Sequence, residues 1–244
     1  MTVAEPSRGP VVFTRAGVLR GVKASLPVLL GMIPFGLVTG VAAHGVGMSL
    51  LEITLMSGIV FAGSAQLVAL GIWTHPPDLV AVTIAAFVIN LRLALMGPVL
   101  APWLDHLRGW RLWGSLFVMV DQNWAMSVGE INAGKRDAGY LLGSGATFWV
   151  MWTLCSALGH VLGAQIEPQP GHPLFFAALA VFVAMLVQMW RGKMDAVPWL
   201  VAAAVATGVA RLMPGTFWYI VAGAIAGSVV GGYRDHAKRE RADA

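Results

Sequence analysis

The sequence predicts an all-α fold, a polytopic bundle of transmembrane helices. Hydrophobic residues make up 57% of the 244 residues and charged residues only 11%. A soluble domain carries about 25% charged residues, so most of this chain cannot face water. The mean hydropathy is +0.73. The apolar runs are long and continuous, which favours helices over a barrel with alternating faces.

A helix needs about 20 apolar residues to cross the hydrocarbon core. We expect seven or eight spans, at least one of them broken or kinked, in a transmembrane domain over 25–232. The flanking tails are 1–24 and 233–244. The eight candidate segments are 25–43, 49–72, 78–101, 112–128, 138–165, 174–190, 196–212 and 216–232.

The first segment has Pro34 and Gly36 at its centre. Pro34 removes a helix hydrogen bond, and a broken helix exposes N–H groups that can receive a carboxylate. The alternative is a kinked, tightly packed helix, because Gly36 and Gly40 form a GxxxG contact. We favour the break for Pro34 and helix packing for the two glycines.

Polar side chains follow in the next three segments. Ser64 and Gln66 lie in the second segment, where they serve either interhelical hydrogen bonding or a solute path. Asn90 lies two residues before Arg92 in the third segment, and Gln122 follows Asp121 in the fourth.

Arg92 and Asp121 are the ionisable residues deepest within these segments. Each lies nine residues from the outer end of its segment, or about 13 Å at 1.5 Å per residue. Consecutive antiparallel helices would place both charges at one depth, where pairing offsets much of the cost of burial. The pair is either a structural ion pair or part of a solute or proton path. One charge of each sign also suits a zwitterion such as an amino acid.

The last four segments offer a packing signal but no chemistry. The fifth is long enough to tilt or to extend past the bilayer, and the eighth has a face of small residues typical of close helix packing. The glycines of that face are Gly223, Gly227 and Gly231.

The positions of Lys and Arg predict the orientation. With eight crossings and an inner N-terminus, twelve of the sixteen Lys and Arg residues lie inside and two outside. This asymmetry places both termini in the cytoplasm. The two exceptions, Arg108 and Arg111, are consistent with a re-entrant segment among the first four.

Several function classes are disfavoured. Cys155 is the single cysteine, which excludes an intrachain disulfide and a cysteine metal cluster. The sequence has neither HExxH nor a phosphate-binding GxxxxGK[ST] motif. We therefore expect no enzyme activity, metal or cofactor, and we assign the basic residues to the membrane rather than to nucleic acid.

Four motifs in order resemble the AzlC family, the large subunit of branched-chain amino acid exporters. The resemblance covers about residues 17–232. The motifs are PFG at 34–36, FAGSAQ at 61–66, NLR at 90–92 and DQNW at 121–124.

The resemblance implies a secondary exporter of branched-chain or related amino acids in the bacterial cytoplasmic membrane. It also implies a second, small membrane subunit resembling AzlD. Proton exchange would drive export. The alternative is that this chain is a structural or assembly subunit and that its partner carries the path. The family pattern has a glutamate where this chain has Gln122.

Overall fold

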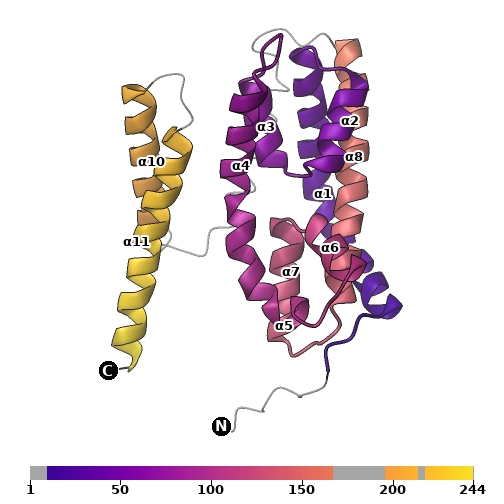
Figure 1. Cartoon of the computed structure of the whole chain (residues 1–244), viewed down its shortest axis with the longest axis vertical. Coiled ribbons are helices and arrows are strands. Elements are labelled where there is room, and N and C mark those ends of the chain that lie inside the picture. The colour runs from indigo at the N-terminus through magenta and orange to yellow at the C-terminus, as the bar shows by residue number, and fades with distance from the viewer. Residues whose placement is uncertain (1–9, 167–195, 214–217, 244) are drawn as a thin grey trace. The chain divides into compact units, whose positions relative to one another are not determined.

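The computed structural model describes residues 10–166, 196–213 and 218–243, which are helical almost throughout (Figure 1). The predicted segment 174–190 lies outside the described residues. Two compact units, Met1–Phe182 and Val183–Ala244, divide the chain. The helices of the first unit are α1 (Arg15–Gly45), α2 (Leu50–Ile59), α3 (Gly63–Gly71), α4 (Leu79–Met96), η1 (Gly97–Leu100), α5 (Ala101–Leu104), α6 (Trp110–Phe117), α7 (Asp121–Asn132) and α8 (Gly139–Ile166). Those of the second unit are α10 (Ala196–Leu212) and α11 (Trp218–Asp243).

Three stretches of the described residues are long and apolar enough to cross a membrane. They are Arg15–Gly45, Leu79–Leu104 and Gly139–Gln165. The 31 residues of α1 extend about 45 Å, more than the roughly 30 Å of the hydrocarbon core. These stretches correspond to the predicted segments 25–43, 78–101 and 138–165.

Helices α1 and α8 pack closely along their length, because glycines remove the side chains between them. A Cβ on Gly40 would lie 2.0 Å from the carbonyl oxygen of Ser156, and one on Gly143 would lie 2.0 Å from that of Val18. Gly36 packs against Cys155 in the same interface. These contacts leave no room for even a methyl group, so the backbones of α1 and α8 touch directly at these glycines.

The predicted break at Pro34 is wrong. Helix α1 runs without interruption from Arg15 to Gly45 and contains both Pro27 and Pro34. A proline inside a membrane helix is tolerated where neighbouring helices hold the backbone, and α8 packs directly on the turn that follows Pro34.

The predicted segment 49–72 does not cross as a single helix. Helix α2 ends at Ile59, and α3 begins at Gly63. His75, after α3, hydrogen-bonds through Nε2 to the carbonyl oxygen of Val46, before α2, at 2.6 Å. The chain therefore returns to the end from which it started. We call residues 50–71 the first hairpin.

The predicted segment 112–128 is also wrong as a single span. Helix α6 ends at Phe117, and α7 begins at Asp121. Phe13 packs edge-on against Trp110 at the start of α6, and the N–H of Val12 donates to the carbonyl oxygen of Arg136 beyond α7. Both outer ends thus lie beside the beginning of α1. We call residues 110–132 the second hairpin.

The two hairpins start from opposite ends of the first unit. The first begins where α1 finishes, and the second begins where α1 starts. At 1.5 Å per residue, helices of 8 to 12 residues reach about 12–18 Å, the middle of a bilayer. Apolar composition alone cannot reveal such a reversal, because two half-helices contain as many apolar residues as one span.

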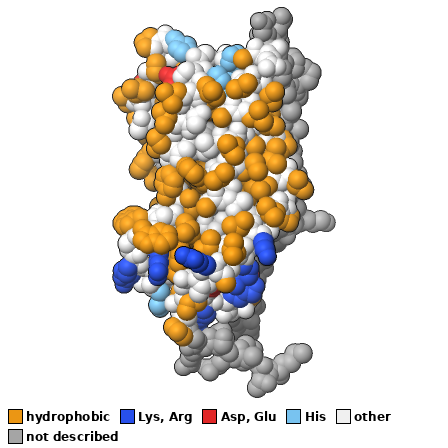
Figure 2. Space-filling model, turned by 90° about the vertical axis from the view of Figure 1, so that its right-hand side faces the viewer, with side chains coloured by type: hydrophobic (Ala, Val, Ile, Leu, Met, Phe, Trp, Pro, Cys, Tyr) orange, Lys and Arg blue, Asp and Glu red, His pale blue; other side chains and the backbone are white. Residues whose placement is uncertain are grey.

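The hairpins also change the side assigned to Arg108 and Arg111. Arg108 precedes α6 and Arg111 lies in its first turn, where Phe13 contacts both Trp110 and Arg111, so the two arginines lie at the same end as the start of α1. Figure 2 shows hydrophobic side chains over the middle of one face and Lys and Arg toward one end, with His side chains at both ends. Apart from Arg92, the Lys and Arg residues described in the first unit all belong to that basic end. They are Arg15, Arg20, Lys23, Arg108, Arg111, Lys135 and Arg136.

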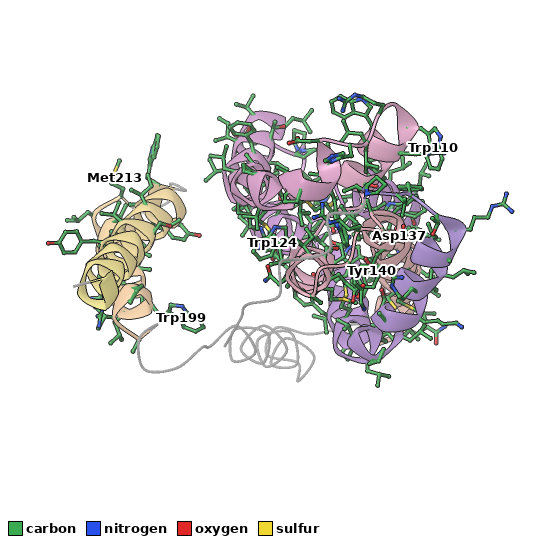
Figure 3. All side chains as sticks on the ribbon, turned by 90° about the horizontal axis from the view of Figure 1, so that it is seen from below. Trp110, Trp124, Asp137, Tyr140, Trp199 and Met213 are labelled. Carbon is green, nitrogen blue, oxygen red and sulfur yellow. The ribbon has the colours of Figure 1, made fainter. Side chains whose placement is uncertain are left out.

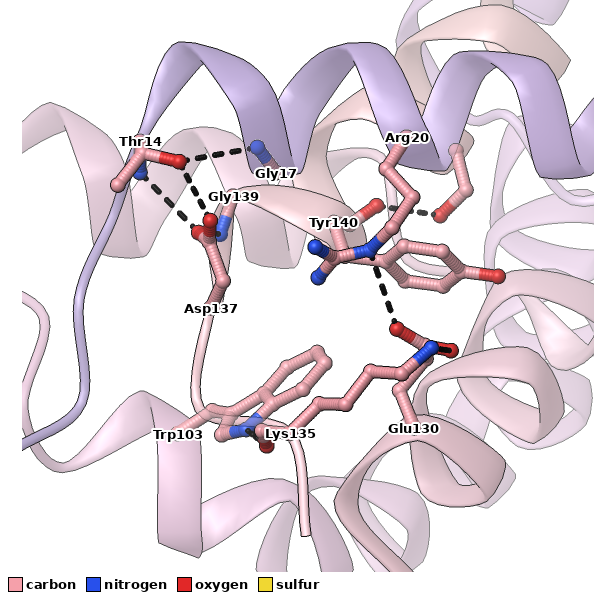
Figure 4. Close-up of polar contacts among 10 residues, drawn as sticks. Thr14, Gly17, Arg20, Trp103, Glu130, Lys135, Asp137, Gly139 and Tyr140 are labelled. Carbon is pink, nitrogen blue, oxygen red and sulfur yellow. Dashed lines mark hydrogen bonds and ion pairs between the residues drawn. The ribbon is translucent and has the colours of Figure 1, made fainter. Parts of the chain in front are cut away.

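Polar contacts fasten the basic end (Figure 4). The carboxylate of Asp137 accepts hydrogen bonds from the N–H and hydroxyl of Thr14 and from the N–H of Gly139. Glu130 forms ion pairs with Arg20 at 3.3 Å and with Lys135 at 2.7 Å. These bonds tie α1, the second hairpin and α8 together where the hairpin begins and ends.

The second unit is a pair of packed helices. Cβ atoms on Gly223 and Gly227 of α11 would lie 2.9 Å from Ala206 and Ala202 of α10. Gly231 faces Pro198 at a longer distance. The glycine face of the eighth segment is therefore used within this chain. Helix α10 coincides with the predicted segment 196–212, and α11 extends past the predicted 216–232 to Asp243.

Candidate functional site

The first hairpin turns at a strained residue. Phe61 adopts a φ of 43°, a left-handed conformation that is unusual for a bulky side chain, and such strain costs on the order of 1–3 kcal/mol. The turn fits beneath two aromatic rings, because a Cβ on Gly63 would lie 2.7 Å from Trp152 and 2.9 Å from Phe35. The PFG motif thus supports this turn through Phe35 instead of breaking α1.

A buried hydrogen-bond network around Gln66 holds the two helices of the first hairpin together. The Gln66 side chain is fully buried, and its Nε2 donates to Ser57 Oγ of α2 at 2.8 Å. Its Oε1 accepts a hydrogen bond from Trp152 Nε1 of α8 at 2.8 Å. Trp149 Nε1 donates to the carbonyl oxygen of Gly58 at 2.8 Å. Both polar atoms of the Gln66 side chain are therefore hydrogen-bonded inside the protein.

The second hairpin turns around the side chain of Asn123. Its Oδ1 accepts the N–H of Val120 at 2.7 Å, and its Nδ2 donates to the carbonyl oxygens of Val118 and Leu141. Gly145 of α8 makes the space, since a Cβ there would lie 2.4 Å from the Val118 oxygen. The amide replaces hydrogen bonds that the backbone loses at the break.

Arg92 of α4 connects the two turns. Its Nη1 lies 2.7 Å from Oδ2 of Asp121, the first residue of α7. Its Nη2 donates to Oγ of Ser64, the second residue of α3, at 2.9 Å. One guanidinium therefore contacts the inner end of each hairpin. The structure brings together three of the residues selected from the sequence.

The charges at this site are only partly covered within the first unit. The side chains of Arg92 and Asp121 are 41% and 30% exposed. Asp121 lies at a helix N-terminus, where the helix dipole favours negative charge. The start of α3 also lacks a side-chain cap, so its first N–H groups are available to an anion. The site combines one cation, one carboxylate and the uncapped start of α3.

The other residues selected from the sequence lie around this centre. Asn90 has a buried Oδ1 without a hydrogen bond in the described part of the chain. Gln122 is half-buried at the second position of α7 and forms no side-chain hydrogen bond within the same residues. Gly36 belongs to the α1–α8 interface, whereas Pro34 is exposed on α1.

Three residues that shape the site were not selected from the sequence. Asn123 sits within the DQNW motif, and its Oδ1 accepts the N–H of Val120, the residue before α7. The usual capping signal is a serine or threonine followed three residues later by a glutamate or glutamine, and the pattern here has valine and asparagine at those positions. Trp149 and Trp152 lie inside a long apolar segment, where no local pattern separates a structural tryptophan from one that contacts another helix.

The family model described as "AzlC protein" matches residues 27–166, more than half of the chain. The chain belongs to the AzlC family. The matched range contains both hairpins and the Arg92–Asp121 pair. The resemblance noted from the four motifs is therefore confirmed.

Curated relatives are described as membrane proteins. The chain is 25% identical to inner membrane protein YgaZ of Escherichia coli over 199 residues, 78% of each chain. It is 27% identical to an uncharacterized membrane protein of Archaeoglobus fulgidus over 220 residues, 88% of this chain and 94% of the other. A Haemophilus influenzae membrane protein is 24% identical over 172 residues, 69% of this chain and 70% of the other. No solved structure matches. The AzlC family and these relatives indicate a role in membrane transport.

Proposed function

We propose that this AzlC-family chain forms the substrate path of a secondary transporter that exports branched-chain or related amino acids. The observation that supports the proposal is the contact of Arg92 with both Asp121 and Ser64 at the inner ends of two opposed hairpins. Transporter sites commonly lie near the bilayer midplane, where interrupted helices present backbone and charged groups to the solute.

The chemistry of the site matches a zwitterion. The carboxylate of an amino acid would bind the Arg92 guanidinium and the uncapped N–H groups at the start of α3. Its ammonium group would bind Asp121. The solute would then replace the direct ion pair between the two residues. The apolar surroundings of the hairpins suit an aliphatic side chain.

The opposed hairpins suggest how the path alternates. The first hairpin separates the site from one face of the membrane, and the second separates it from the other. Movement of one hairpin at a time would open the site to one side only. Exchange of a proton on a carboxylate of the path would couple this movement to export.

The positions of the basic residues support a cytoplasmic location for the basic end. Lys and Arg are enriched on the cytoplasmic side of membrane proteins, and the hairpins remove the two exceptions of the eight-span arrangement. In this orientation the N-terminus is cytoplasmic. We also propose cytoplasmic placement of the C-terminus and assembly with a small AzlD-like membrane subunit.

Counterflow of labelled leucine in proteoliposomes, with and without a pH gradient, tests this proposal. We expect Arg92→Gln and Asp121→Asn to lower uptake about 10- to 100-fold, because a hydrogen bond to a charged group contributes about 1.5–3 kcal/mol. The matched control is Arg20→Gln, which removes an arginine from a comparable ion pair at the basic end.

Two results would contradict the proposal. The first is full transport by both site variants. The second is full transport by the small partner subunit alone, which would favour the structural role for this chain. Reconstitution of each subunit separately and then together distinguishes these outcomes.

A further inference from the structure

A basic hollow lies at the start of the second hairpin, away from the Arg92 site. Its volume is about 300 Å³, and its lining includes Phe13, His106, Arg108, Trp110 and Arg111. None of the described residues that line it is acidic. The hollow therefore concentrates positive charge without a partner carboxylate in its wall.

Both arginines of the hollow are held in place by the protein. Nη1 of Arg108 donates to the carbonyl oxygens of Asp105 and Leu107, each at 2.8 Å. The guanidinium carbon of Arg111 lies 5.3 Å from the ring centre of Phe13 and 6.0 Å from that of Trp110. Stacking and backbone hydrogen bonds reduce the entropy that each guanidinium would lose on binding a phosphate.

An apolar stripe leads away from the hollow along α6. Trp110, Trp113 and Phe117 are 66%, 69% and 50% exposed, and their spacing places them on one helix face. Trp110 projects at the rim of the first unit in Figure 3. Exposed tryptophans beside arginines are typical of the boundary between lipid headgroups and acyl chains.

We propose that this hollow binds the headgroup of an anionic phospholipid and that an acyl chain of the same lipid lies along the α6 stripe. The phosphate contacts Arg108 and Arg111, and the aromatic rings contact the glycerol and upper chain. The continuity of the basic hollow with the apolar stripe selects a lipid over a soluble phosphate, which would use only the hollow. The bound lipid stabilises the start of the second hairpin against Phe13.

Native mass spectrometry of the purified full chain, titrated with phosphatidylglycerol or phosphatidylcholine, tests the site. We expect preferential binding of phosphatidylglycerol. The double variant Arg108→Gln with Arg111→Gln should weaken that binding about 30-fold, at about 1 kcal/mol for each arginine near an anionic headgroup. The control Arg15→Gln removes an exposed charge at the same end and should retain wild-type binding.

A second double variant controls for misfolding, and competition with inorganic phosphate distinguishes a lipid from a soluble anion. The double variant Arg108→Lys with Arg111→Lys keeps the charge but loses the stacking and the backbone hydrogen bonds, so its affinity should lie between that of the wild type and that of the glutamine variant. Inorganic phosphate should not displace the lipid. The proposal is overturned by equal binding of the two lipids, by wild-type affinity in the glutamine variant, by displacement with phosphate, or by loss of binding in the lysine variant equal to that in the glutamine variant.

Discussion

Nη1 of Arg92 lies 2.7 Å from Oδ2 of Asp121, although the two residues belong to helices that are separated by η1, α5 and α6. Asp121 is the first residue after the turn of the second hairpin, and the same guanidinium donates to Ser64 just after the turn of the first. A movement of either hairpin must therefore alter the surroundings of Arg92.

The hairpins predict which loops share a side of the membrane. In a Cys155→Ala background, single cysteines at Arg108→Cys and Lys135→Cys should react with an impermeant maleimide from the same side. Thr74→Cys should react from the opposite side, because His75 pairs with Val46 at the far end of α1. The labelling is compared between intact cells and inverted vesicles. Labelling of positions 108 and 135 from opposite sides would support the eight-span arrangement instead.

Ser64 orients the Arg92 guanidinium, and its loss should affect substrate affinity. We expect Ser64→Ala to raise KM about 3- to 10-fold with little change in kcat, since a typical net hydrogen bond contributes about 0.5–1.5 kcal/mol. Ser64→Thr should restore the hydroxyl and the affinity. The control is Thr54→Val, because the one hydrogen bond of the Thr54 hydroxyl among the described residues is to the carbonyl oxygen of Leu50 in its own helix. A fall in kcat alone would contradict an orienting role.

Gln66 should be important for stability. Gln66→Leu leaves both Ser57 Oγ and Trp152 Nε1 buried without a partner, so we expect the thermal midpoint in detergent to fall by about 5–10 °C. Gln122→Leu is the matched control, because that side chain forms no hydrogen bond in the described residues. Equal midpoints for the two variants would show that the hydrogen bonds of Gln66 contribute nothing to thermal stability.

The α1–α8 interface should reject even one methyl group. A Cβ on Gly159 would lie 2.0 Å from the carbonyl oxygen of Leu37, so Gly159→Ala should destabilise the fold by about 1–3 kcal/mol. Gly129 of α7 has open space around it. Gly129→Ala should raise the free energy of unfolding by about 0.5–1 kcal/mol, because alanine has less backbone freedom than glycine in the unfolded chain. Denaturant unfolding measures the free energy of unfolding of both variants. A change of the same sign in the two would contradict this prediction.

The sequence was most informative where the physics is local. Long apolar runs predicted helices at 25–43, 138–165 and 196–212, and the structure has α1, α8 and α10 there. The break expected at Pro34 is absent, because the close packing of α8 supports α1 beside the proline. The same limit applies to 49–72 and 112–128, because apolar composition does not show whether a segment crosses the membrane or turns back within it.

Arg92 and Asp121 form the expected ion pair in a different geometry from the one expected. The sequence predicted both charges on two antiparallel spans that follow one another. The structure brings them together differently, with Asp121 at the inner end of a half-helix. The cost of leaving a charge unpaired in apolar surroundings favours pairing in either arrangement.

Composition and local pattern by themselves determined the membrane class, the helical content, the polar candidates and the family resemblance, because each depends on residues that are neighbours in sequence. Only the tertiary structure decided that two predicted spans are hairpins from opposite ends and that Ser64, Arg92 and Asp121 meet. It also gave Asn123 and Trp152 their roles. These features depend on contacts between distant segments, whose partners are selected by packing and by hydrogen bonds that a broken helix must find elsewhere.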